Sequence, residues 1–141
     1  MNPVDNAVFD NIALSVTDLE RSMTWYTEVL GFTPGYRTYS TAVEAELQIM
    51  QRPDMRIELL SQKGSTRSPD AEVVPGPHLR TSGFKALVLR TDDLEDVTRR
   101  LEDHGVEFVW KNRVLSDDGL RSTMLRDPDK NLINVLRYPD R

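Results

Sequence analysis

The sequence has 141 residues, of which 38% are hydrophobic and none is cysteine, and its formal net charge is −5. This size and apolar content suffice for one buried core, and the absence of cysteine excludes disulfides, thiolate nucleophiles and cysteine metal ligands. Charges of both signs are interspersed and no stretch approaches the roughly 20 apolar residues of a membrane span, so we expect no nucleic-acid partner and no membrane. The N-terminus has neither a basic start nor an apolar run, which predicts a cytoplasmic protein.

The first predicted elements are a strand and a helix. Apolar and polar residues alternate from Phe9 to Val16, as in a strand that is buried on one side. An apolar stripe at helical spacing follows and runs as far as Gly31, and Thr17 with Glu20 matches an N-terminal capping pair. Segments 32–39, 45–51 and 55–61 then have strand character.

The same order of elements returns in the second half of the chain. Subtracting 75 places Asp93 on Asp18, and subtracting 76 places residues 132–136 on 56–60. This match predicts a strand up to Arg90, then a helix capped by Asp92, and then strands at 106–113, 120–126 and 132–137. The sequence therefore predicts an α+β fold in which two tandem βαβββ modules, 8–62 and 83–139, form a cup-shaped, partly closed mixed sheet within a single domain, 1–141. Residues 63–82, rich in Ser, Pro and Gly, are the linker or lid between the modules.

Glu58 is the candidate catalytic residue. The alternation in 56–60 places it on the sheet face that the helix leaves free, between apolar neighbours. A carboxylate that loses hydration there is expected to have a raised pKa, useful for a general base, unless a cation compensates it. Arg56, two residues away on the same face, is the candidate cation, and an ordinary ion pair in a polar groove is the alternative interpretation.

Further side chains are candidates for binding a small molecule. Tyr36, Tyr39, Met50 and Trp110 lie on predicted strands and would stack on a flat substrate, although such residues more often belong to a core. His78 lies in the linker, where it would fold over the site or remain a solvated imidazole.

Four segments carry a family resemblance: FDNIALSVTDLERSMTWYTEVLGF, RIELL, ALVLRTDDLEDVTRRLEDHGVEF and RDPDKNLINVL. Together they resemble the vicinal oxygen chelate superfamily, which includes glyoxalase I, extradiol dioxygenases and bleomycin-resistance proteins. The resemblance implies paired βαβββ modules that form a cup, completed by dimerisation in many members, so a homodimer is expected. It also implies a divalent metal held by four inward-facing residues.

Those four metal positions correspond to Asn11, Glu58, Ala86 and Asn134. One carboxylate, two neutral amides and a methyl group are a poor set for a hard divalent ion, so we expect neither a metal nor another cofactor. The resemblance instead places the amides of Asn11 and Asn134 beside Glu58, where they would hydrogen-bond a carbonyl or enolate oxygen of the substrate.

Three functions fit this sequence. The first is a metal-independent enzyme in which Glu58 is the general base and acid of an isomerase, epimerase, cyclase or lyase reaction on a carbonyl-containing or polycyclic metabolite. The second is a protein that binds an antibiotic or drug without chemistry, as the bleomycin-resistance group does. The third is a metal-dependent, glyoxalase-like lyase.

Overall fold

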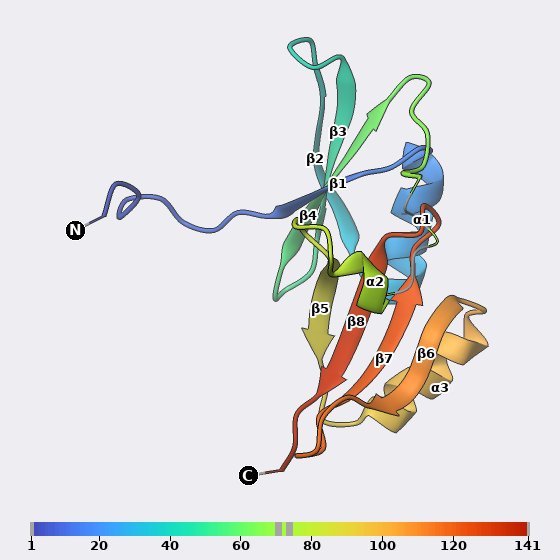
Figure 1. Cartoon of the computed structure of the whole chain (residues 1–141). Helices are drawn as coiled ribbons and strands as arrows, with labels where there is room; N and C mark the ends of the chain where they lie inside the picture. Colours follow the sequence, from blue (N-terminus) through green and yellow to red (C-terminus); the bar gives the residue numbers. More distant parts are fainter. Residues whose placement is uncertain (1, 70–71, 73–74, 141) are drawn as a thin grey trace. The chain divides into compact units, whose positions relative to one another are not determined.

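The computed structural model describes residues 2–69, 72 and 75–140. It divides into two compact units, Met1–Thr66 and Arg67–Arg141, and each unit holds one of the two predicted modules. Each unit is an α+β module with the order βαβββ and a four-stranded mixed sheet, as the internal repeat predicts. The units are described one at a time (Figure 1).

The first module is a sheet with the strand order β1-β4-β3-β2 and one helix. β1 and β4 are parallel, and the other neighbouring strands are antiparallel. The helix packs on one face of the sheet, against β2, β3 and β4, and does not cover the opposite face. Its elements are β1 (Ile12–Ser15), α1 (Leu19–Leu30), β2 (Thr33–Ser40), β3 (Ala45–Gln51) and β4 (Arg56–Gln62).

The second module repeats this arrangement with the strand order β5-β8-β7-β6 and the helix α3 on one face. A short helix, α2, precedes it in the segment predicted as the linker. No helix in the described residues is both long and apolar enough to cross a bilayer. The elements are α2 (Pro75–His78), β5 (Ala86–Arg90), α3 (Leu94–Asp103), β6 (Glu107–Val114), β7 (Arg121–Arg126) and β8 (Leu132–Arg137).

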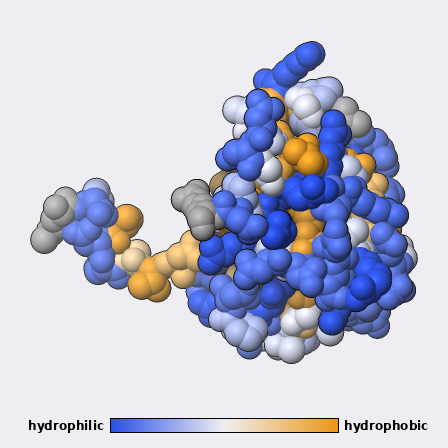
Figure 2. All heavy atoms as spheres, turned by 90° about the horizontal axis from the view of Figure 1, so that it is seen from below, coloured by the Kyte–Doolittle hydropathy of each residue, from blue (hydrophilic) through white to orange (hydrophobic). Residues whose placement is uncertain are grey.

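Residues 2–10 precede the first strand and belong to no helix or strand. The predicted strand 9–16 is therefore too long, because pairing begins only at Ile12, which lies opposite Ile57. Val4, Val8 and Phe9 of this segment are exposed, and Figure 2 shows apolar, orange atoms along it. Asp10, next to the strand, is bound by the side chain of Arg56 in the sheet.

Both long helices begin at an aspartate, one residue later than the predicted caps Thr17 and Asp92. Asp18 and Asp93 are the N-caps, and each carboxylate accepts a hydrogen bond of 3.1 Å from the backbone N–H three residues further on. A short carboxylate is well suited to this position, where it also faces the positive end of the helix dipole. At the other end of α1, Gly31 adopts the predicted left-handed conformation, with φ 75°.

The RDPD segment after β7 is a turn held by one buried carboxylate. Asp127 is 3% exposed and accepts hydrogen bonds from the backbone N–H groups of Asp129 and Asn131, both at 2.8 Å, and from the Asn131 amide at 2.9 Å. Lys130, with φ 72°, completes the turn, and its hydrogen bond to Glu107 raises the pKa of the ammonium group above its ordinary value. These contacts give the segment a structural role.

Ser22 of α1 is a buried polar residue. Its side chain is fully buried, and its hydroxyl makes no hydrogen bond within the described residues. Thr98 of α3 is also buried, but its hydroxyl donates to the carbonyl of Leu94 at 2.7 Å and lies 2.6 Å from the Thr123 hydroxyl. A buried hydroxyl without a partner loses hydration and gains nothing in return.

Replacing Ser22 by Ala should therefore raise the free energy of unfolding by about 1 kcal/mol, because the unsatisfied hydroxyl is removed and alanine favours a helix. Thr98→Ala should lower it by about 1–2 kcal/mol, because Thr123 loses a buried partner. Urea unfolding followed by circular dichroism measures both. A loss of stability in the Ser22 variant would contradict this account.

Candidate functional site

Glu58 lies in the middle of β4, on the face opposite α1. Its neighbours Ile57 and Leu59 are 0% exposed and belong to the core, so alternation turns the Glu58 side chain to the other face. Its cross-strand neighbours there are Ala13 of β1 and Ile49 of β3. The residue is half-buried, and both of these cross-strand neighbours are apolar.

The Glu58 carboxylate has no hydrogen bond and no ion pair within the described part of the chain. Arg56 shares its face but is bound elsewhere: the guanidinium forms an ion pair with the carboxylate of Asp10, and its Nε donates to the Asp10 backbone carbonyl at 3.3 Å. The expected compensation of Glu58 by Arg56 is therefore not observed. The ordinary ion pair, the alternative interpretation, is not observed either.

Asp10 also holds Asn11, the first of the predicted amide residues. The Asn11 Nδ2 donates to the second carboxylate oxygen of Asp10 at 2.6 Å. One carboxylate thus binds both Arg56 and Asn11, just before β1. The sequence analysis did not identify Asp10 as a partner of Arg56 and Asn11. The feature that could have indicated it is an acidic residue directly before the predicted amide, Asn11.

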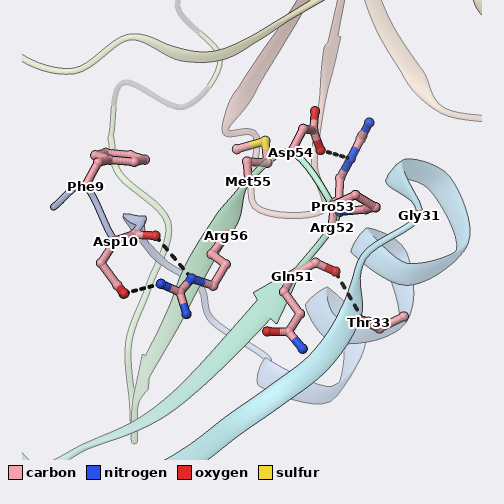
Figure 3. Close-up of a pocket in the computed structure, with 10 residues that line it drawn as sticks. All are labelled: Phe9, Asp10, Gly31, Thr33, Gln51, Arg52, Pro53, Asp54, Met55 and Arg56. Carbon is pink, nitrogen blue, oxygen red and sulfur yellow. Dashed lines mark hydrogen bonds and ion pairs between the residues drawn. The ribbon is translucent and has the colours of Figure 1, made fainter.

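A hollow of about 660 Å³ lies at the end of this sheet face, beside the turn between β3 and β4. Figure 3 shows Arg56 and Asp10 facing each other on one side of the hollow, with Gln51 and Thr33 on the other. Arg56 belongs to the predicted set of ligand-binding residues, whereas Glu58 does not line the hollow. The lining residues are Phe9, Asp10, Gly31, Thr33, Gln51, Arg52, Pro53, Asp54, Met55 and Arg56.

The second arginine of the hollow, Arg52, has a structural role. Its Nε forms an ion pair with Asp54 at 2.9 Å, and its Nη1 donates at 2.9 Å to the carbonyl of Leu30, the last residue of α1. Its guanidinium carbon also lies 5.7 Å from the centre of the Phe32 ring. Both arginines of the hollow are thus paired with aspartates, and the hollow attracts neither sign of charge strongly.

Two of the predicted ligand contacts on this module are corrected by the strand register. Met50 lies opposite Ile57 and is 0% exposed, so it belongs to the core under α1. Tyr39 lies opposite Glu46, whose carboxylate binds Arg37 on the α1 side of the sheet, so Tyr39 does not share the face of Glu58.

The third aromatic candidate of this module, Tyr36, is 68% exposed beside the irregularity between Pro34 and Arg37. Its contact with a ligand stays a prediction.

The second module brings Trp110 and Asn134 together through Ser122. The indole N–H of Trp110 donates to the Ser122 hydroxyl at 2.9 Å, and that hydroxyl donates to the Oδ1 of Asn134. An indole N–H can only donate, so the serine oxygen accepts from it, and the serine O–H is the donor in the bond to Asn134. The NH₂ group of Asn134 is left without a partner among the described residues, as a pair of free donors.

The other two predicted residues of this module contribute less. Ala86 lies on β5 opposite Leu132 and offers only a methyl group. His78 ends α2 and is half-buried, and its backbone carbonyl accepts a hydrogen bond of 2.8 Å from Lys85. The His78 imidazole makes no hydrogen bond in the described part of the chain, so its role as a ligand contact stays a prediction.

The donor atoms at the four family metal positions do not fit a divalent ion. The Asn134 oxygen is occupied by Ser122, Ala86 has no donor, and only Glu58 supplies a charged oxygen. No three acidic or histidine side chains cluster as metal ligands within residues 2–69, 72 and 75–140. No chemical step is therefore assigned to a metal.

Comparisons with known proteins agree with this architecture. No curated protein matches the sequence significantly. A glyoxalase family protein from Enterococcus faecalis has a similar structure, with a TM-score of 0.76 and 18% identity, over 92% of this chain and 97% of that one. An integron cassette protein from V. cholerae has a TM-score of 0.61 and 27% identity, over 94% and 95%. The fosfomycin resistance protein FosX from Listeria monocytogenes has a TM-score of 0.66 and 15% identity, over 92% and 91%.

The sequence itself matches a family model along most of its length. Residues 8–135 match the model described as Glyoxalase/Bleomycin resistance protein/Dioxygenase superfamily. This range contains all of both modules except the last two residues of β8. The chain therefore belongs to the glyoxalase/bleomycin resistance protein/dioxygenase superfamily, a group of small-molecule-binding proteins that contains many enzymes.

Proposed function

We propose that this protein is a metal-independent enzyme in which Glu58 transfers a proton on a small carbonyl-containing or polycyclic metabolite. The observation that supports this proposal is a half-buried carboxylate between two apolar cross-strand neighbours, with no partner in the described part of the chain. The only cation two residues away on that face is already bound to Asp10. Leaving such an acid unpaired costs solvation energy, which favours a functional reason for it.

The chemistry follows from the free carboxylate. Glu58 removes a proton from the carbon next to a carbonyl group, and the electrons of the broken C–H bond form an enolate. Glu58 then returns the proton to a neighbouring carbon on the same face, or to the original carbon after the enolate has turned its opposite face toward the carboxyl group. The product is an epimer or an isomer, and no oxidant or reductant is consumed. An unpaired carboxylate accepts a proton without first breaking an ion pair.

Binding without chemistry is the second candidate function. It is supported by relatives whose names refer to drug resistance, the fosfomycin resistance protein among the similar structures and the bleomycin resistance proteins in the family description. The hollow with neutral charge pairs offers room for such a ligand. In the enzyme, a bound carbonyl compound exchanges the proton on the carbon next to its carbonyl group with solvent, whereas in a binding protein it does not.

Proton exchange into D₂O tests the proposal on a panel of 2-hydroxy ketones and 1,2-dicarbonyl compounds, followed by proton NMR. Wild-type protein should accelerate exchange on at least one compound, and Glu58→Gln should reduce that rate by about 100-fold or more, because the base is lost. Glu46→Gln, on the α1 side of the same sheet, should leave the rate unchanged. Equal rates in wild type and Glu58→Gln, or saturable binding without exchange, would contradict the enzyme proposal.

Added metal should not stabilise the protein. A ligand that binds only the folded state raises its stability in proportion to the logarithm of its concentration over Kd. Because the donor set is poor, Mg²⁺, Mn²⁺, Zn²⁺ or Ni²⁺ at millimolar concentration should leave Tm unchanged. Differential scanning calorimetry checks this, with EDTA-treated protein as the reference. A rise in Tm that Glu58→Gln abolishes would favour the metal-dependent lyase.

A further inference from the structure

A bulge in β6 places Trp110 and Arg113 on the same face of the second sheet. Trp110 lies opposite Met124 and Arg113 opposite Ser122, so three steps on β6 match two steps on β7. Residues three apart on a regular strand point to opposite faces, and one inserted residue brings them to the same face. The Arg113 guanidinium carbon accordingly lies 5.0 Å from the centre of the Trp110 ring.

The bulge is fixed by its own hydrogen bonds. Asn112 has φ 46°, a conformation that asparagine tolerates better than most residues. Arg121 donates to the Asn112 side-chain oxygen at 2.8 Å and to its backbone carbonyl at 3.0 Å, and the Asn112 N–H donates to the Thr123 hydroxyl at 2.9 Å. The position of Arg113 over Trp110 is thus set by the sheet.

Hydrogen-bond donors predominate on this face. The free NH₂ group of Asn134 lies on the face that carries Trp110 and Ser122, opposite α3. Arg113 has no ion pair among the described residues, and neither does Arg90, which lies on the same face opposite Leu136. The four strands contain one acidic residue, Glu107, whose carboxylate is already shared by Arg126 and Lys130.

We propose that this face of the second module binds a small organic anion of the carboxylate or enolate class. Arg113 donates to the anionic oxygens and supplies the opposite charge, Asn134 donates its NH₂ group, and Trp110 offers an apolar surface to the carbon skeleton. Ser122 is a positioning residue, because it holds the Asn134 amide with the oxygen turned away from the ligand. The proposal concerns the second module alone and does not depend on proton transfer by Glu58.

Benzoate, with benzamide as its uncharged analogue, tests this proposal by NMR titration of ¹⁵N-labelled protein. Benzoate should shift the indole N–H signal of Trp110 and the side-chain NH₂ signal of Asn134 in a saturable way, with the Trp25 indole unmoved. Benzamide should bind about tenfold more weakly, because it lacks the charge that Arg113 recognises. The Glu58→Gln variant should bind benzoate as wild type does.

Variants separate the recognition site from general surface binding. Arg113→Gln should weaken benzoate binding about tenfold, and Ser122→Ala should weaken it severalfold, because the Asn134 amide is free to turn over. Asn112→Gly should keep the affinity, because glycine accepts the positive φ, whereas Asn112→Val should lose it with the bulge.

The melting temperature of each variant establishes that it is folded, and Arg113→Gln, an exposed substitution, provides the test if Asn112→Val does not fold. No shift with benzoate, equal binding of benzoate and benzamide, or unchanged binding by Arg113→Gln would each overturn the proposal.

Discussion

The carboxylate of Asp10 is the group on which the candidate chemistry of the first module depends. One of its oxygens binds Arg56 and the other accepts from Asn11. Arg56 shares a sheet face with Glu58 at a separation of two residues, so it is the natural ion-pair partner for that acid. Because Asp10 holds the guanidinium at the end of the strand, Glu58 has no counterion among the residues that the structure describes. The arrangement leaves this carboxylate unpaired there without removing the nearby positive charge from the sheet.

The two modules share a backbone plan but have opposite polarity at equivalent positions. Glu58 corresponds to Asn134, and in the strand register Leu47, opposite Leu60, corresponds to Ser122, opposite Leu136. The first module thus places an acid between two apolar cross-strand neighbours, Ala13 and Ile49, which offer it no side-chain hydrogen bond. The second surrounds an amide with a hydroxyl and an indole that fix its direction. One backbone plan thus carries different side chains on the corresponding faces of the two sheets.

Local patterns predicted the elements well and long-range contacts poorly. The alternation of apolar and polar residues predicted strand 45–51 and the sheet face on which Glu58 lies, and Gly31 predicted the end of α1. These features depend on residues that are neighbours in sequence. The partner of Arg56 lies 46 residues away, so no local pattern revealed it. Met50 was misplaced because its face depends on the register between β3 and β4, and a shift of one residue reverses every side chain. The position of Arg113 was hidden for the same reason, since a bulge reverses the alternation after Asn112.

The hydrogen bond between Ser122 and Asn134 leaves the NH₂ end of that amide, and not its oxygen, without a partner among the described residues. An amide binds a cation through its oxygen and an anion through its NH₂ group, so one orientation excludes the other. The Ser122 hydroxyl accepts from the Trp110 indole and donates its own hydrogen to the Asn134 oxygen. The direction of this second bond gives the Asn134 amide its orientation. With Arg113 held over the same indole, this face presents a guanidinium and an amide NH₂ group, an arrangement suited to a negatively charged ligand.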